Sequence, residues 1–318
     1  MNRPHLARFA LPGFEALLPP AAGRESGRVT VARFANRELT VSVDGEVADA
    51  CCLVLGSIAP PDEQMLALAM TADALKRQGA ERVVALLPYL AYARQDKEEP
   101  GKSLGTAWVG EILRASGVDE LVTIDIHSQR AAELLAMPVT SMSPAELFAA
   151  EIQRAGLLDA TIVAPDEGAM DRSRAVAKAA GIDGPVACLR KERTATGVTH
   201  RELAEEVGRR AVVVDDILDT GGTLVSCCRE LARHGVAEVT VMVTHGLFTG
   251  EGWKELPPLV DRLYVTDSVP ALAARPPDGV QVISIGPLLE RALESGYHRS
   301  HGSQREERAP GGAAGGTS

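Results

Sequence analysis

Short apolar runs alternate along the chain with longer stretches in which apolar residues recur every three or four positions. A short apolar run predicts a buried strand, and the longer periodicity predicts a helix with one buried face. The predicted strands cover residues 29–32, 50–55, 82–87, 120–124, 160–164, 211–214, 238–244 and 280–284. The predicted helices cover residues 62–78, 106–116, 144–155, 170–180, 223–234 and 287–294.

The helix predicted at 62–78 shows the pattern clearly. Met65, Leu68, Ala72 and Leu75 recur at steps of three and four, and Gly79 is a usual C-terminal stop. Because strands alternate with helices, the expected fold is α/β, with mostly parallel sheets flanked by helices.

The connection at 134–144 carries two prolines and little periodicity, which predicts a boundary between two α/β halves of similar size. We expect an N-terminal domain at 1–143 and a C-terminal domain at 144–296, and a length of 318 residues suits two domains. Residues 297–318 repeat Gly, Ser, Arg and Glu without apolar periodicity, so we expect a disordered tail.

Composition narrows the class of partner. Hydrophobic residues make up 45% of the chain and aromatic residues only 3%, so few aromatic rings can stack on nucleobases. The net charge of -10 leaves no basic excess to neutralise a nucleic-acid backbone. We therefore expect no nucleic-acid partner, although a small anion held by local amides and a few cations remains open.

The five cysteines contain no C-x-x-C pair and are read as small buried hydrophobes. The first residues lead into no sustained apolar stretch, and no apolar run approaches the ~18 residues that a membrane helix needs. We expect a cytoplasmic protein without a membrane partner.

Acidic, small and hydroxyl residues follow the strand predicted at 211–214. Asp215 and Asp216 come first, at the strand end where open parallel sheets bind ligands. The next helix then opens with two glycines, which let backbone amides approach an anion, flanked by two threonines that add hydroxyl donors. The candidate phosphate-binding residues are Asp219, Thr220, Gly221, Gly222 and Thr223.

Carboxylates such as Asp215 and Asp216 accept hydrogen bonds from vicinal hydroxyls or face a cation. Phosphate donors beside hydroxyl acceptors describe a sugar-phosphate site. Residues 212–223 resemble the phosphoribosyl pyrophosphate motif of type I phosphoribosyltransferases and of the ribose-phosphate pyrophosphokinases, or phosphoribosyl pyrophosphate synthetases. The resemblance implies two similar phosphoribosyltransferase-like domains.

Residues 92–96, Tyr-Ala-Arg-Gln-Asp, resemble the nucleotide-binding loop of the synthetases, which the transferases lack. Arg94 offers a planar fork for phosphate or an adenine edge, and Gln95 and Asp96 add donors and acceptors. These residues are the first candidates for binding ATP.

Asp125-Ile-His127 follows the strand predicted at 120–124 and resembles the family segment whose histidine contacts ATP phosphates and magnesium. Asp166 lies in a segment that resembles the family loop holding metal and ribose phosphate. The resemblance therefore implies Mg²⁺ as cofactor, with His127 and Asp166 as its ligands. The departures from the family loop are Ala164, Ala169 and Asp171.

Lys191 and Arg193 resemble the family's catalytic Lys-x-Arg pair at the root of a mobile loop, 24 residues before Asp215. Glu192 stands where the family often has a basic residue. By the same resemblance, these two cations would meet the charge that develops on the reacting phosphates.

Residues 33–38 resemble a family loop that reaches the ATP site of a neighbouring subunit in homodimers and hexamers. Phe34 and Glu38 match that loop, while Asn36 and Arg37 replace Asp and Gly. Phe34, Asn36 and Glu38 are therefore further candidates for binding ATP, and the resemblance implies a homo-oligomer.

The likeness runs from about residue 29 to 293 and implies transfer of pyrophosphate from ATP to O1 of ribose 5-phosphate, giving phosphoribosyl pyrophosphate and AMP. Two alternatives stay open. One is a type I phosphoribosyltransferase with the same sugar motif, and the other is a catalytically silent homologue that regulates a synthetase.

Overall fold

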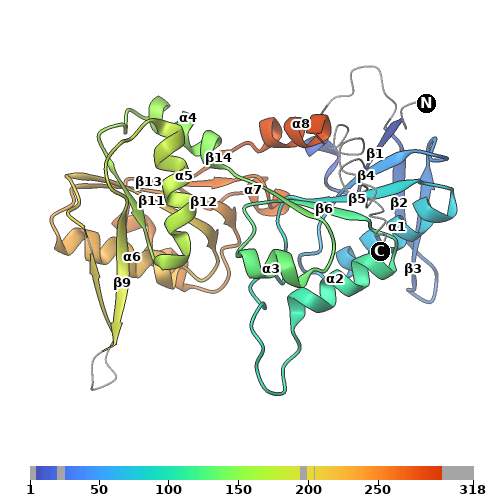
Figure 1. The fold of residues 1–318 in the computed structure, drawn as a ribbon, viewed down its shortest axis with the longest axis horizontal. Helices are drawn as coiled ribbons and strands as arrows, with labels where there is room; N and C mark the ends of the chain where they lie inside the picture. Colours follow the sequence, from blue (N-terminus) through green and yellow to red (C-terminus); the bar gives the residue numbers. More distant parts are fainter. Residues whose placement is uncertain (1–4, 20–25, 194–198, 204, 296–318) are drawn as a thin grey trace, which may run out of the picture.

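The structure is a computed structural model that describes the chain except for residues 1–4, 20–25, 194–198, 204 and 296–318 (Figure 1). The tail predicted at 297–318 lies outside the described residues. Two sheets lie side by side, one in each half of the chain (Figure 1).

The sheet of the first half has five parallel strands. In spatial order they are β1 (Leu6–Ala10), β4 (Cys51–Leu55), β5 (Arg82–Leu87), β6 (Glu120–Ile124) and β7 (Val139–Met142). The connecting helices are α1 (Glu63–Arg77), α2 (Gly105–Ala115) and α3 (Gln129–Leu134). A separate antiparallel hairpin is formed by β2 (Arg28–Arg33) and β3 (Leu39–Asp44).

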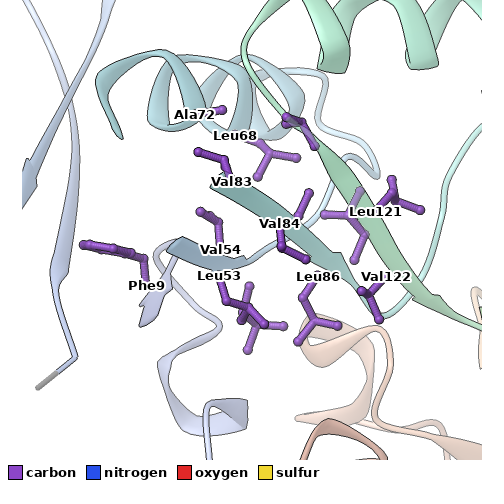
Figure 2. Packing of buried hydrophobic residues seen from close by; sticks show 14 of the residues in the cluster. Phe9, Leu53, Val54, Leu68, Ala72, Val83, Val84, Leu86, Leu121 and Val122 are labelled. Atoms are coloured by element: carbon purple, nitrogen blue, oxygen red, sulfur yellow. The ribbon is translucent and has the colours of Figure 1, made fainter. Parts of the chain in front are cut away.

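Aliphatic side chains fill the core of this half (Figure 2). Leu68 and Ala72 of α1 lie over Val83 and its neighbours on the central strands, as the periodicity of residues 62–78 predicts. Strands buried on both faces suit near-continuous apolar runs, which explains why β4, β5 and β6 were detectable from the sequence.

The sheet of the second half has seven strands, parallel except for the β9–β10 pair. In spatial order they are β10 (Thr199–Leu203), β9 (Ala187–Arg193), β8 (Thr161–Ala164), β11 (Arg210–Leu218), β12 (Glu238–Gly246), β13 (Arg262–Thr266) and β14 (Val280–Ile283). The helices are α4 (Ala145–Arg154), α5 (Met170–Ala180), α6 (Gly222–Arg233), α7 (Pro270–Ala273) and α8 (Gly286–Ser295). Short 3-10 turns lie at Glu15–Leu17, Glu167–Ala169, Gly252–Glu255 and Pro257–Leu259.

Strand β11 shows why helices cover both faces of this sheet. Val212 and Val214 pack in the cluster that contains α4 and α5, while Val213 packs in the cluster that contains α6. Successive side chains of a strand point to opposite faces, so one apolar run supplies two cores.

The α/β class with two parallel, helix-flanked sheets is confirmed, and each predicted strand and helix has a counterpart within a few residues. Strands β1, β3, β7, β9, β10 and β13 and helices α3 and α7 lie outside the predicted elements. Most of them are edge strands or short elements with weak periodicity. In the described part of the chain, no helix has the length and apolarity needed to cross a membrane.

The predicted boundary at 134–144 contains β7, the edge strand of the first sheet. Helix α8 returns to the first half, where Ile285, Leu288, Leu289 and Ala292 join its buried cluster. The domain limits at 143 and 296 remain a proposal, and the returning helix ties the chain's last described segment to its first core.

Candidate active site

A cavity of about 570 Å³ lies where the two halves meet. Its first-half lining includes Arg94, Asp96 and His127, and its second-half lining includes Asp166 and Arg172. The remaining predicted residues that line it are Asp215, Asp216, Asp219, Thr220, Gly221, Gly222 and Thr223. The structure thus gathers into one cavity residues that the sequence places up to 129 positions apart (223 − 94).

His127 and Asp216 join the two halves across this cavity. His127 Nδ1 donates to Asp216 Oδ2 at 2.7 Å, and the histidine side chain is 37% exposed while the aspartate is 8% exposed. His127 follows β6 and Asp216 lies in β11, so the carboxyl ends of the two sheets face each other. That arrangement places the candidate ATP-side histidine against the candidate sugar-side acid.

The pKa values of the two adjacent acids of β11 are shifted in opposite directions. Burial and the negative charge of Asp216 raise the pKa of Asp215 well above its ordinary value. Burial also acts to raise the pKa of Asp216, but the hydrogen bond from His127 and the charge of Arg172 lower it well below the ordinary range. The pair therefore favours one negative charge, held on Asp216.

Arg172 was absent from the predicted site residues, and it is the cation that links the acids of both halves. Its guanidinium lies 3.3 Å from Asp125, 3.6 Å from Asp215 and 3.5 Å from Asp216, and its side chain is only 12% exposed. Burial acts to lower the pKa of Arg172, but the three carboxylates raise it. Its position one turn into the helix after the Asp166 loop was the sequence signal available.

The phosphate loop is built by a close backbone approach. Gly221 is the N-cap of α6 with φ 84°, and a Cβ at this position would lie 2.6 Å from the Cα of Trp253. The amide of Thr249 donates to the carbonyl of Asp219 at 3.1 Å, and its hydroxyl donates to the Asp219 carboxylate. Residues 249–253, outside the predicted site, therefore brace the loop from behind.

The three residues of the Arg-Gln-Asp segment, 94–96, make different contacts at the site. Arg94 Nη1 pairs with Asp219 Oδ2 at 2.6 Å, which joins the segment to the phosphate loop. Asp96 is buried and accepts a 2.7 Å hydrogen bond from Ser128 Oγ, which in turn caps α3. Gln95 directs its side chain toward Gly105, where an added Cβ would meet Gln95 Oε1 at 2.3 Å.

Two predicted groups belong to the antiparallel strand pairs. Phe34, Asn36 and Glu38 are at the turn of the β2–β3 hairpin, which lies at the end of the molecule remote from the second half (Figure 1). Lys191 and Arg193 lie on β9, which extends from the second sheet as part of an antiparallel pair (Figure 1). Their proposed roles remain proposals.

Magnesium is the metal that the resemblance implies. Among the described residues, no three His, Cys, Asp or Glu side chains converge in a group suited to a metal ion. Both residues that the resemblance implies as ligands, His127 and Asp166, nevertheless line the cavity. Magnesium is commonly held by one or two carboxylates together with water and substrate phosphates, so this donor set fits a metal that binds with the substrate.

Two mostly parallel, helix-flanked sheets, with the candidate phosphate loop at 219–223 after β11, define an α/β protein of the phosphoribosyltransferase type. Residues 14–117 match the model of the N-terminal domain of ribose phosphate pyrophosphokinase, and residues 131–258 match that of the phosphoribosyl transferase domain.

Known proteins resemble the chain over most of its length. The ribose-phosphate pyrophosphokinase of Mycoplasma pneumoniae is 32% identical, with 84% of each chain covered. That of Campylobacter jejuni is 29% identical, with 84% of this chain and 87% of that protein covered. The crystal structure of phosphoribosylpyrophosphate synthetase from Mycobacterium smegmatis has a TM-score of 0.81 at 27% identity, covering 93% of this chain and 99% of that one. The chain belongs to the ribose-phosphate pyrophosphokinase family.

Proposed function

We propose that this chain transfers a pyrophosphoryl group from ATP to O1 of ribose 5-phosphate, forming phosphoribosyl pyrophosphate and AMP. The observation that carries the proposal is the shared cavity, in which His127 of the candidate ATP side contacts Asp216 of the candidate sugar side at 2.7 Å. A reaction between two substrates needs such a meeting point, because catalysis depends on holding the reacting groups together.

The second half supplies the acceptor side. The amides around Gly221 and Gly222 and the hydroxyls of Thr220 and Thr223 would hold the 5-phosphate at the N-terminus of α6. Asp216, kept negative by His127 and Arg172, would accept a hydrogen bond from a ribose hydroxyl. Sugar and phosphate are thereby oriented by adjacent segments of one strand and helix.

The first half supplies the nucleotide side. Arg94 and His127 would contact ATP phosphates, and Asp96 would act indirectly by holding Ser128 at the start of α3. His127 and Asp166 would hold Mg²⁺, which when bound screens the negative charge of the phosphate oxygens. Phe34, Asn36 and Glu38 would serve the ATP site of a neighbouring copy, so the homodimer or hexamer and the cytoplasmic location stay predictions from the resemblance.

The transfer is an in-line displacement. The anomeric hydroxyl oxygen of ribose 5-phosphate forms a bond to the β-phosphorus and releases its proton. The bond from that phosphorus to the α,β-bridging oxygen breaks, and AMP leaves with the bridging oxygen. Such reactions depend on positioning and on stabilising charge over the phosphoryl oxygens. Lys191 and Arg193 are proposed to meet that charge from the end of β9.

The test is a coupled assay with ATP, ribose 5-phosphate and Mg²⁺ that measures AMP and phosphoribosyl pyrophosphate. The protein should form both, and Lys191→Ala should lower kcat on the order of 10²–10³-fold. Lys178→Ala, which removes an exposed cation from the last turn of α5, is the matched control and should retain activity. A pure protein that forms neither product would refute the proposal.

A catalytically silent regulatory homologue remains the second candidate, because the hairpin turn and the Asp166 loop depart from the family pattern. Asp171, the added carboxylate, is 99% exposed in its side chain and pairs with Arg174 at 3.2 Å. Asp171 also lines the cavity, so this departure from the family pattern lies at the candidate site itself. Activity that requires addition of a related subunit would favour the silent homologue, and base-dependent release of pyrophosphate would revive the transferase.

A further inference from the structure

His245 lies between the two halves of the molecule. It lies near the carboxyl end of β12, is 2% exposed, and both of its ring nitrogens have partners. Nδ1 is 2.8 Å from Ser268 Oγ, and Nε2 is 3.1 Å from the carbonyl oxygen of Ile124 in β6. The ring also lies against Tyr89 of the first half, with 4.9 Å between ring centroids.

The partners of His245 define its tautomer. The Ile124 carbonyl can only accept a hydrogen bond, so Nε2 must carry the proton and donate it. Nδ1 then accepts from the hydroxyl of Ser268 at 2.8 Å, and the Thr244 carbonyl, which lies 3.0 Å from the same hydroxyl, accepts from the hydroxyl of Thr266 at 2.6 Å. Burial lowers the pKa of His245, in agreement with a neutral ring that has one donor and one acceptor.

The segment that His245 holds carries the ATP-side histidine. Ile124 is the last residue of β6, and Asp125 next to it has φ 46°, a left-handed conformation that L-residues adopt only at a cost. Contacts from the second half support this bend, because Thr244 Oγ1 donates to Asp125 Oδ2 at 2.6 Å and Arg172 Nε lies 3.3 Å from Asp125 Oδ1. His127 follows two residues later.

Packing alone does not account for a histidine at this point. An aliphatic side chain would fill the same buried space without carrying a polar ring into the core, where an unpaired polar group is unfavourable. What the imidazole adds is a donor directed at the other half of the protein. Without it, the Ile124 carbonyl would lose a partner at the place where the two sheets meet.

We propose that His245 is a positioning residue, which fixes the carboxyl end of β6 against the second half and so sets the place of His127 relative to Asp216. This inference rests on the proposed function, because it assigns to His245 the alignment of the two substrate sites. His245 is not among the described residues that line the cavity. It therefore acts through Ile124 and Asp125 rather than on a substrate.

The consequence is a change in kcat without an equal change in binding. Each substrate is held mainly by its own half, so loss of the alignment leaves each KM nearly unchanged. The reacting groups are then displaced, and a displacement of about 1 Å can lower a rate ~10²-fold.

The experiment compares H245Q with H245M. The glutamine amide can reach the Ile124 carbonyl as Nε2 does, whereas methionine has similar length and volume and no donor. H245M should lower kcat about 10²-fold with both KM values within about threefold of the original, and H245Q should restore kcat to within about threefold. If H245M does not fold, H245N replaces it, since asparagine keeps the Ser268 contact and is too short to reach Ile124.

A second measurement does not depend on activity. Hydrogen–deuterium exchange of the peptide covering residues 124–128 should be faster in H245M than in H245Q at equal thermal stability. Similar kcat in both variants, or similar exchange of this peptide, would overturn the positioning role. An original protein that makes no AMP would refute the proposed function instead, and the exchange comparison would still decide whether His245 holds β6.

Discussion

The candidate phosphate loop and the candidate ATP-side segments line the same cavity, but different contacts hold them in place. The loop at 219–223 is braced within its own half, by the close approach of Trp253 to Gly221 and by Thr249 on Asp219. The ATP side reaches across to the other half, through Arg94 to Asp219 and through His127 to Asp216.

The loop is therefore a local site within one half, whereas the ATP-side site is assembled from both halves. A phosphate loop braced by neighbouring backbone forms whenever its own sheet folds. The ATP-side residues take their places only when the two halves are docked, because their partners belong to β11, β12 and the phosphate loop. Changes in the loop backbone should therefore affect binding of one substrate, whereas removal of an ion pair that crosses the seam between the two halves should affect binding of both.

The largest effect is expected from Gly221→Ala. A Cβ here would meet the Trp253 backbone at 2.6 Å, and φ 84° is unfavourable for alanine, so the loop must shift. We expect KM for ribose 5-phosphate to rise on the order of 10²-fold, measured by steady-state assay. Binding of ATP, measured by calorimetry, should change little.

Gly235→Ala is the matched control for the backbone conformation. Gly235 has φ 78° after α6, and an added Cβ meets nothing within 4 Å. It should lower Tm slightly and leave both KM values in place. A ribose 5-phosphate KM that is unaffected in Gly221→Ala would contradict the loop's rigid bracing.

The ion pair between Arg94 and Asp219 tests the assembled side. Arg94 is 51% exposed in its side chain, so solvent screening limits the pair to about 0.5–1 kcal/mol. A double-mutant cycle of Arg94→Ala and Asp219→Ala, read out as the dissociation constant of ATP, should show coupling of this size. Strictly additive losses would show that Arg94 does not depend on the phosphate loop.

Sequence patterns were sufficient for the strands that are buried on both faces. Runs such as 82–87 and 120–124 are apolar throughout because helices cover both sides of them. Strand β7 and the β9–β10 pair lie at sheet edges and mix polar with apolar residues. Their pairing depends on neighbours far away in the sequence, which a local pattern does not contain.

The site shows the same division. Residues 219–223 form a continuous motif whose glycines and threonines predict a phosphate loop. All residues of this motif line the cavity. Arg172, His245 and Trp253 act through contacts with distant segments, and each alone reads as an ordinary helix, strand or turn residue. Folding of the second half brings Trp253 to the loop, whereas docking of the two halves brings Arg172 and His245 against the end of β6.

The pair of acids in β11 provides a test by pH. Because burial and Asp216 raise the pKa of Asp215, its contribution to stability is fully present below the unfolded pKa of about 3.9 and is lost as pH rises through the folded pKa. Asp215→Asn mimics the protonated acid, so Tm should rise by about 2–4 °C at pH 8 and match the original near pH 4.

Asp216→Asn is the opposite control. The hydrogen bond from His127 and the charge of Arg172 lower the pKa of Asp216 against the effect of burial, so its contribution is present above about pH 3.9 and is lost as pH falls through the folded pKa. The variant should be less stable than the original at pH 8, with a gap that narrows in acid. If both variants shift Tm in the same direction at pH 8, the division of charge between the two acids is wrong.

The smallest effect is expected at the hairpin turn, which lies outside the docked seam. Arg37 has φ 72° where the family loop has glycine, and its amide closes the turn on the Phe34 carbonyl at 2.8 Å. Arg37→Gly removes about 1 kcal/mol of backbone strain but adds a similar amount of unfolded-state freedom, so Tm should stay within about 2 °C. Asp49→Gly, at φ 55° outside the turn, is the matched control for backbone strain. If the turn serves the ATP site of a neighbouring copy, only Arg37→Gly should change KM for ATP, and KM for ribose 5-phosphate should stay constant; a change in both KM values would place the turn within the seam instead.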